Sequence, residues 1–426
     1  MHIFFATNNL GGGGTNVSRF IIHLKSLNTK NIGILLNYYY LNNDFKKTMS
    51  FDQDVLRNIL THSDIREFLS YVKDTFISKG RISDSSKIKN VDNIASYILD
   101  SGSGNILRDL IKDEELNDTS ISKLILLYHN FAEKLNFDFV VALDYALKYT
   151  HKQGENESDN YQNLASELTN NEKENLKLLK TTLQTIGTKN FKHKILAPLH
   201  GFNFESFKKY QYDILKLENQ NNSQFNGFAL GGIADTKKLK NELWNVPAKL
   251  KLDEKNIWIV SKLTKQTYEL SKERFLHVLG AGNIKAIPFL NRYGATSSDC
   301  HSAWRRANDG DQKGENISKI LVPLFDDKLQ FIDNKDVFEY VTLDKISNYK
   351  FPDCNDFSIK EIAKLYNSAN KEDFYYAKIL IFIHALYQYD RLINFMKTNT
   401  KNYIELLSKS PDKKLNNLYL KILDLI

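Results

Sequence analysis

Short apolar runs recur along the chain, and most of them are separated by stretches with helical periodicity. Eight such runs share this character: 2–7, 31–36, 95–100, 137–144, 193–200, 227–231, 275–280 and 295–300. Continuous apolar strands that alternate with helices are typical of a parallel sheet buried on both faces. Eight strand–helix units therefore predict a (β/α)8 TIM barrel.

Several stretches lie outside this pattern of eight strand–helix units. The run "NIWIVSKL" at 256–263 is a possible extra strand, and the polar stretch 150–176 is expected to be a surface insertion or loop, with a helix resuming near Asn175. Residues 52–80 show helical spacing. The last hundred residues are helix-like and rich in Tyr, Phe and Lys. We therefore expect a barrel over 1–325 and a mainly helical C-terminal region over 326–426.

Composition narrows the class of protein. Of 426 residues, 42% are hydrophobic and 26% charged, as in globular proteins, and no apolar run approaches the roughly 20 residues of a membrane span. The start "MHIFFATNN" is unlike a signal peptide. Two cysteines, Cys300 and Cys354, exclude a site built on several thiolates, and the histidines are scattered. We expect a cytoplasmic protein without a metal.

The net charge of +7 is compatible with a polyanionic partner but favours nucleic acid only slightly. The glycine run "GGGGTN" at 11–16 follows a predicted strand and precedes a helical stretch at 17–27. A phosphate-binding loop would need a lysine after the glycines, whereas Thr15 and Asn16 stand there. A tight turn capped by Thr15, or a loop close to a ligand backbone, is the preferred interpretation, so no nucleotide cofactor is predicted.

Polar and glycine residues mark the ends of the apolar runs. They are Asp100, Asp144, His200, the glycines at 231–232, "GAG" at 280–282, and Asp299. In a barrel these ends meet on the face where active sites lie. A single Asp there is readily explained as a helix cap. Three carboxylates on one rim are harder to explain structurally, because their mutual repulsion costs stability unless a substrate or the chemistry compensates.

Two carboxylates can catalyse displacement at an anomeric carbon. One attacks C1′ and forms a covalent glycosyl-enzyme, while the other protonates the leaving group. Water as the incoming group gives hydrolysis, and a free base gives base exchange. A third carboxylate beside a Gly-Gly backbone can read the edge of a purine-like base.

The motifs occur in a recognisable order. "LDSGSGN", "VVALD", "LHG", "FALGGIA", "HVLGAG" and "GATSSDCHSAWRRANDG", from about 95 to 310, resemble the tRNA-guanine transglycosylase superfamily, whose fold is a (β/α)8 barrel. The resemblance implies that Asp299 is the nucleophile and Asp100 the general acid/base. It implies phosphate contacts from Arg305 and Arg306, near the backbone-binding groove.

The resemblance also implies a base pocket. Its expected members are Asp144, His200, Gly231, Gly232, Ser101 and Tyr145. Asp144 matches the guanine-reading acid, and His200 stands where the family usually has Gln. Gly104 and Asn105 occupy the place of the family's stacking aromatic, so Tyr145 is a candidate to replace it.

The chain lacks the three cysteines and the histidine that bind zinc in tRNA-modifying members. It therefore resembles the DNA-directed 7-deazaguanine branch of bacteria and phages. This implies exchange of guanine in DNA for a free 7-deazaguanine such as preQ0, in a bacterial or phage-infected cell, protecting DNA from restriction without a cofactor. Two alternatives remain open: the same exchange on tRNA, and a non-catalytic partner subunit that binds nucleic acid.

Overall fold

The computed structural model describes most of the chain. The described residues are 1–7, 31–38, 96–101, 118–145, 157–231, 244–271, 273–308, 317–353 and 357–426. The glycine run at 11–16 and the helical stretches expected at 17–27 and 52–80 lie outside them.

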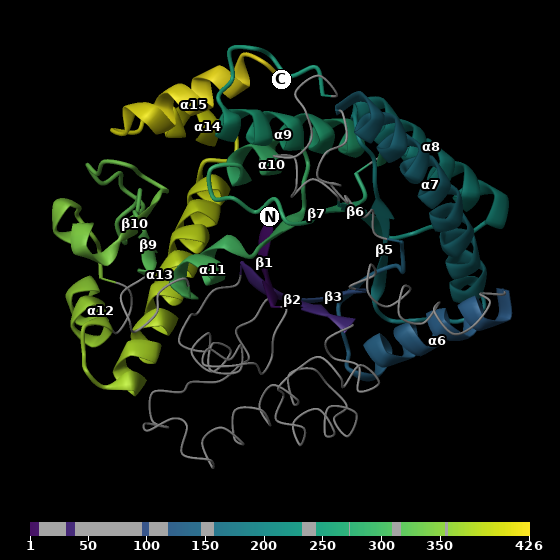
Figure 1. Ribbon diagram of the computed structural model, residues 1–426, viewed down its shortest axis with the longest axis horizontal. Helices are drawn as coiled ribbons and strands as arrows, with labels where there is room; N and C mark the ends of the chain where they lie inside the picture. The colour runs from purple at the N-terminus through teal and green to yellow at the C-terminus, as the bar shows by residue number, and fades with distance from the viewer. Residues whose placement is uncertain are drawn as a thin grey trace.

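From residue 96 to residue 308, strands and helices alternate along the described chain (Figure 1). The strands are β1 (His2–Thr7), β2 (Ile32–Asn37), β3 (Ser96–Asp100), β4 (Phe139–Val141), β5 (Lys194–Leu199), β6 (Gly227–Leu230), β7 (Phe275–Val278), β8 (Ser297–Cys300), β9 (Lys319–Leu321) and β10 (Tyr340–Thr342). The helices are α6 (Asp118–Lys134), α7 (Glu157–Gly187), α8 (Phe204–Asn221), α9 (Leu252–Ser271), α10 (Ile287–Arg292), α11 (Ser302–Asn308), the 3-10 helix η4 (Leu343–Asn348), α12 (Ile359–Tyr366), α13 (Lys371–Thr398), α14 (Tyr403–Leu407) and α15 (Lys413–Leu423).

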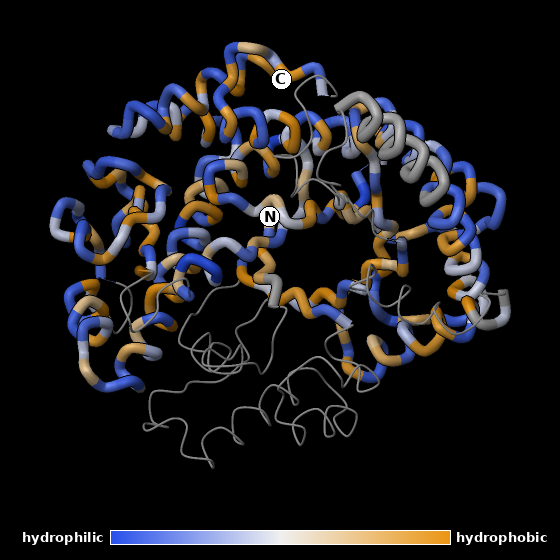
Figure 2. Tube along the Cα trace, in the orientation of Figure 1, coloured by the Kyte–Doolittle hydropathy of each residue, from blue (hydrophilic) through white to orange (hydrophobic). Residues whose placement is uncertain are grey.

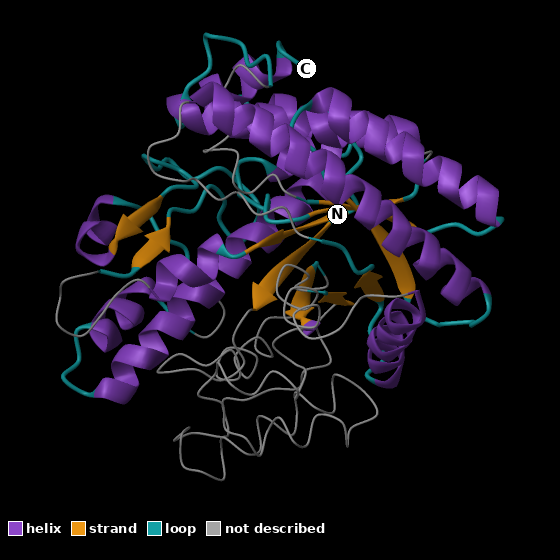
Figure 3. Ribbon diagram, turned by 45° about the vertical axis from the view of Figure 1, so that its right-hand side comes forward, coloured by secondary structure: helices purple, strands orange, loops and turns teal. Residues whose placement is uncertain are grey.

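The first eight strands form a closed parallel barrel. They follow one another around it in chain order, from β1 to β8, and β8 pairs with β1. Helices surround the strands (Figure 3). This confirms the predicted (β/α)8 barrel, and each strand falls within one residue of, or inside, a predicted apolar run.

The barrel interior is a small apolar cluster of its own. Its members come from six different strands: Phe4, Leu35, Ile98, Val141, Leu196 and Ala229. Side chains alternate along a strand, so their neighbours point outward and pack under the helices in a much larger cluster. The strands accordingly appear apolar along most of their length (Figure 2).

The possible extra strand at 256–263 is wrong, because these residues lie inside α9. The helix is buried on several sides: Ile257, Trp258, Ile259 and Val260 are each at most 6% exposed. The C-terminal segment covers the face away from the barrel, where the indole of Trp258 donates to the carbonyl of Leu425. A helix buried on several sides loses the one-sided pattern that distinguishes it from a strand.

The prediction of a loop over 150–176 is also wrong from Glu157 on. Helix α7 begins there and continues to Gly187. No proline or glycine interrupts the chain from 158 to 186, so nothing ends the helix within the polar stretch. From residue 172 on, where the structure describes the side chains of α7, Leu178, Leu179 and Leu183 face the core.

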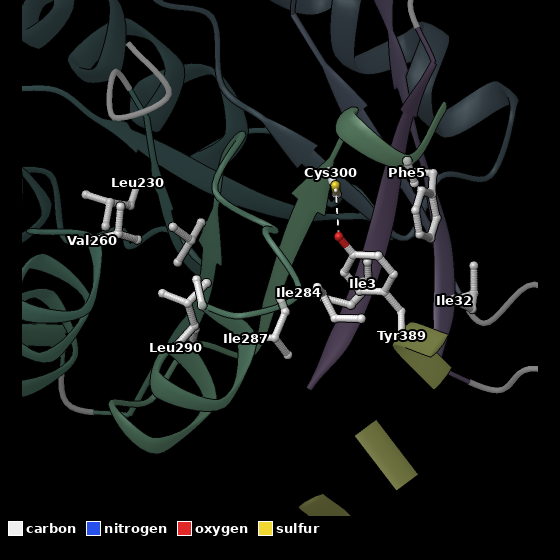
Figure 4. Packing of buried hydrophobic residues seen from close by; sticks show 14 of the residues in the cluster. Ile3, Phe5, Ile32, Leu230, Val260, Ile284, Ile287, Leu290, Cys300 and Tyr389 are labelled. Atoms are coloured by element: carbon white, nitrogen blue, oxygen red, sulfur yellow. Dashed lines mark hydrogen bonds between the residues drawn. The ribbon is translucent and has the colours of Figure 1, made fainter. Parts of the chain in front are cut away.

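The C-terminal region packs directly on the barrel. β9 and β10 form a two-stranded antiparallel sheet, and the 3-10 helix η4 and four α-helices follow in the described part of the chain. The long helix α13 lies beside β1 and β8. The ring of its Tyr389 packs edge-on against Phe5, with 5.9 Å between centroids, and its hydroxyl contacts the sulfur of Cys300 (Figure 4). Residues 326–426 are thus mainly helical, and their division from the barrel as a separate domain stays a prediction. No helix among the described residues is long and apolar enough to cross a membrane.

Candidate active site

The predicted site residues gather at the carboxyl ends of the strands. Asp100 ends β3, Asp144 follows β4, His200 follows β5, Gly231 follows β6, and Asp299 lies in β8. Gly232 lies outside the described residues. Parallel strands bring these ends to one face of the barrel. The structure therefore places the predicted residues on a common rim, in two groups.

The first group is centred on Asp144. His200 Nε2 lies 2.5 Å from Asp144 Oδ2, and the Ser101 hydroxyl donates to Oδ1 at 3.3 Å. Asp144 is 6% exposed and Ser101 is fully buried. Both carboxylate oxygens are therefore oriented by neighbours from β3 and β5. When Nε2 of His200 donates to Asp144, its Nδ1 is left to act on a ligand, as an acceptor in the neutral ring.

Gly231 belongs to the same group. A Cβ atom added to it would lie 3.3 Å from the side chain of Leu279 and 3.7 Å from Cε1 of His200. Its backbone N–H donates to the carbonyl of Leu199. The absence of a side chain leaves the space beside the imidazole open, as a flat ligand would require.

Asp100 sits at the end of β3 and is half-buried, unlike the other two acids. The register pairs it with Asn37 of β2, whose amide approaches its Oδ2 at 3.5 Å. It stands two residues after Ile98 of the interior cluster, so its side chain faces the inside of the barrel at the rim. A partly exposed carboxylate in this position can exchange protons with a bound molecule.

Tyr128 of α6 supports the first group from the helix side, and no pattern in the sequence singles it out. Its fully buried hydroxyl lies 2.8 Å from the carbonyl of Val141 and 3.2 Å from that of Leu99. Burial and the negative charges of Asp100 and Asp144 hold its pKa well above the ordinary value. The neutral hydroxyl thus ties the end of β3 to the end of β4.

Asn175 of α7 is a second contributor that sequence reasoning missed. Its side chain accepts from the backbone N–H of Tyr145 at 2.5 Å and donates to the carbonyl of the same residue at 3.2 Å. Asn175 is 1% exposed. The amide therefore clamps the peptide next to Asp144. In the sequence it is one asparagine among several in a polar stretch, so nothing there distinguishes it as a residue that supports the site.

Tyr145 itself makes its contacts on the helix side. Its ring packs against the outer core cluster, and the pKa of its hydroxyl is raised by burial and by the charge of Glu174 on α7. These contacts do not favour the predicted stacking on a base, which stays a prediction.

The second group is centred on Asp299, which is 6% exposed. Its Oδ1 accepts from the backbone N–H of Gly280 at 2.7 Å and lies 3.3 Å from Nε2 of His277. Gly280 has φ +68°, and a Cβ atom on Gly282 would lie 2.6 Å from the Asp299 carbonyl. Both glycines of the "GAG" turn are therefore needed for its close approach to Asp299.

A hydrogen-bonded pair lies directly below this carboxylate. His277 Nδ1 is 2.8 Å from the hydroxyl of Ser297, and both residues are fully buried inside the barrel. The motif "HVLGAG" contains this histidine, but only its glycines were identified from the sequence.

The two groups lie on different arcs of the mouth. Asp100 and Asp144 belong to β3 and β4, and Asp299 to β8, with β1 and β2 between them along the barrel wall. A molecule bound over the mouth can therefore meet Asp299 on one side and the other two acids on the other. That is the arrangement expected of a nucleophile opposite an acid/base and a base-reading group.

The two arginines that are predicted to bind phosphate differ in their exposure to solvent. Both lie on α11, directly after β8, with Arg305 exposed and Arg306 half-buried. Arg306 is close enough to β10 that its charge acts on the Tyr340 hydroxyl, opposing the increase in pKa that burial causes. Arg305 is the better placed of the two to reach a phosphate.

Comparison with protein-family models gives no match, and comparison with curated proteins gives none either. Over the part of the chain that the structure describes, no group of three or more His, Cys, Asp or Glu side chains could hold a metal ion.

Proposed function

We propose that the protein is a DNA guanine transglycosylase, which exchanges guanine in DNA for a free 7-deazaguanine. The observation that carries the proposal is the placement of three carboxylates at one barrel mouth in three different environments. Asp299 is anchored through Oδ1, Asp144 is held by His200, and Asp100 is half-buried at the rim. Such a division supports separate roles for the three acids.

The first half of the reaction uses Asp299 as the nucleophile. The target guanosine leaves the base stack so that a side chain can reach C1′. A carboxylate oxygen of Asp299 attacks C1′, the bond from C1′ to the guanine N9 breaks, and its electron pair leaves with the base. Asp100 supplies the proton that neutralises the departing guanine, so that a covalent glycosyl-enzyme remains.

The second half reverses these roles with a different base. The 7-deazaguanine takes the place of guanine beside Asp144 and His200, and Asp100, now ionised, removes its N9 proton. N9 attacks C1′, and the electron pair of the C1′–O bond returns to Asp299. The enzyme ends in its starting protonation state, so the exchange needs no external proton donor or oxidant.

DNA is preferred to tRNA as the substrate because the sequence lacks the zinc ligands of the tRNA-modifying proteins. With two cysteines, it cannot form the three-cysteine and one-histidine zinc site of the tRNA-modifying proteins that it resembles. The net charge of +7 and the exposed Arg305 support phosphate contacts to either nucleic acid.

The test is an exchange assay with labelled preQ0. The full-length protein is incubated with duplex DNA or with tRNA, and each is digested to nucleosides that are separated and counted. Label in DNA nucleosides supports the proposal. Label in tRNA alone would move the activity to the alternative substrate, and label in neither would favour a non-catalytic nucleic-acid-binding subunit.

A further inference from the structure

The interior of the barrel holds one imidazole directly beneath the proposed nucleophile. His277 is 0% exposed, and the ring of Phe4 meets it edge-on at 5.6 Å between centroids. The register pairs His277 with Ala229 on one side and with Ser297 on the other. Among the apolar side chains of the interior cluster, a buried polar ring requires a reason.

The two polar neighbours of His277 favour one tautomer. Its Nδ1 lies 2.8 Å from the Ser297 hydroxyl, and its Nε2 lies 3.3 Å from Oδ1 of Asp299. With the proton on Nδ1, the lone pair of Nε2 would face the carboxylate oxygen, which is repulsive. With the proton on Nε2, Nδ1 accepts from Ser297, and an N–H donor rather than a lone pair lies beside Asp299 as a buried donor without a hydrogen bond.

The two oxygens of Asp299 are consequently different. Oδ1 accepts a hydrogen bond from Gly280 and lies 3.3 Å from His277 Nε2, which makes no hydrogen bond in this geometry, whereas Oδ2 receives none from the residues that the structure describes. Oδ2 is therefore the oxygen available to bond to C1′. The 3.3 Å separation at Nε2 is long, as is common in catalytic contacts without a bound substrate.

We infer that His277 is a positioning residue that stabilises Asp299 as it leaves C1′ in the second half of the reaction. This inference rests on the proposed function. In the covalent intermediate, Oδ1 is an ester carbonyl oxygen, which is a weak acceptor. When the incoming base displaces Asp299, the electron pair of the C1′–Oδ2 bond returns to the carboxylate and negative charge develops on Oδ1. At that moment the hydrogen bond from Gly280 strengthens, and the unpartnered Nε2–H of His277, 3.3 Å away, gains an acceptor to which it can close.

The inference is tested by following the covalent adduct. Wild-type protein and the variants His277→Phe, His277→Gln and Ser297→Ala are incubated with DNA, and preQ0 is then added. The adduct is followed on denaturing gels as it forms and as it discharges. His277→Phe should slow discharge by about 100-fold, the scale for removing one oxyanion donor, and should raise the steady-state amount of adduct.

The two other variants distinguish positioning from packing. His277→Gln keeps a side-chain N–H and should recover part of the discharge rate. Ser297→Ala removes the hydroxyl that fixes the tautomer of His277, so its discharge rate should lie between those of the wild type and His277→Phe. Discharge of His277→Phe at the wild-type rate, or Phe and Gln variants that are equally slow, would overturn the inference and leave the proposed function standing.

A spectroscopic measurement does not depend on activity. Nitrogen-15 chemical shifts of the wild-type histidines, assigned with His277→Gln, should show His277 as the Nε2–H tautomer. The Nδ1–H tautomer would refute the inference whatever the discharge rates of the variants. A wild-type protein that forms no adduct with DNA or tRNA and exchanges no base would instead remove the proposed function, and the inference with it.

Discussion

His200 and Asp144 form a close pair at the barrel mouth, with Nε2 of the imidazole 2.5 Å from Oδ2 of the carboxylate. They come from the segments that follow two neighbouring strands, β5 and β4. The aspartate is nearly buried, so the imidazole replaces solvent that the carboxylate would otherwise need. Removing either partner therefore changes how the other meets a ligand.

Replacing His200 should weaken binding of the incoming base more than it slows the chemistry. His200→Ala leaves Asp144 without its closest partner, and we expect the KM for free 7-deazaguanine to rise about 10–100-fold, the cost of one hydrogen bond to a charged group. His200→Gln retains an N–H and should lose less. Initial rates at varied base concentration measure both. Lys209→Ala, which removes an exposed ion pair with Glu172, is the matched control and should leave KM unchanged.

Replacing Asp299 should abolish exchange while leaving DNA binding intact. Asp299→Asn has nearly the same shape but cannot act as a nucleophile, and we expect the exchange rate to fall by about 10⁴-fold or more. Asp299→Ala should behave in the same way. Label incorporation measures exchange, and fluorescence anisotropy with labelled duplex measures binding. Exchange retained in either variant would refute the assignment of the nucleophile. Asp253→Asn, at an exposed acid in the first turn of α9, is the control.

The hydroxyl of Tyr128 offers a stability test with a built-in comparison. Tyr128→Phe removes a buried donor that lies between the carbonyls of Leu99 and Val141, so the free energy of unfolding should fall by about 1–2 kcal/mol. Tyr210 is equally buried, but its hydroxyl has no hydrogen-bond partner in the described structure. Tyr210→Phe should therefore be neutral or slightly stabilising. Urea denaturation of both variants checks the difference, and equal losses would show that the two hydroxyls are equivalent.

Replacing Asn175 should lower activity through the backbone that it holds, because its side chain contacts the peptide next to Asp144. Asn175→Ala removes both hydrogen bonds to the peptide of Tyr145, and Asn175→Asp retains only the acceptor. We expect the alanine variant to lose about 1–3 kcal/mol of stability and the aspartate variant less. Exchange should fall in the same order, because this peptide adjoins Asp144. Asn221→Ala, which removes a side-chain hydrogen bond to the carbonyl of Leu217 within α8, should leave exchange unaffected.

Acid should destabilise the fold through a buried histidine pair near the start of β5. His129 Nδ1 lies 2.9 Å from His193 Nε2, and His193 Nδ1 lies 3.1 Å from Glu133. Burial, reinforced by the charge of His193, lowers the pKa of His129 to about 3. Burial also lowers the pKa of His193, although Glu133 opposes this. In the unfolded chain both would titrate near 6.5.

Below about pH 6.5 the unfolded chain therefore binds protons that the folded chain does not. The stability is fully present above this pH and is lost as the pH falls toward 3. Between pH 7.5 and 5.0, His129 alone accounts for a loss of about 2 kcal/mol. His129→Gln, which does not titrate, should lose that much less in urea denaturation at the two pH values. The exposed His301→Gln should follow the wild type, and parallel pH curves for all three proteins would contradict the assignment.

The barrel was predictable because its strands are short, apolar and regularly spaced. The identity of the rim acids was predictable too, because Asp100 and Asp299 end such runs. What could not be predicted depends on contacts between distant segments. The run at 256–263 resembles a strand because α9 is buried on several sides. One of those sides is covered by the segment around Leu425, more than 160 residues later in the chain. Likewise, Tyr128 and Asn175 act through backbone groups of other segments, and a sequence carries no signal of which carbonyl a buried side chain will meet.

The contact between Phe5 and Tyr389 has a consequence for how the protein is made. The first strand of the barrel leaves the ribosome well before α13, which covers it and emerges nearly four hundred residues later. At ordinary translation rates of 5–20 residues per second, the outer face of β1 waits roughly 20–80 s for its cover. During synthesis that apolar face is a natural place for a chaperone to bind.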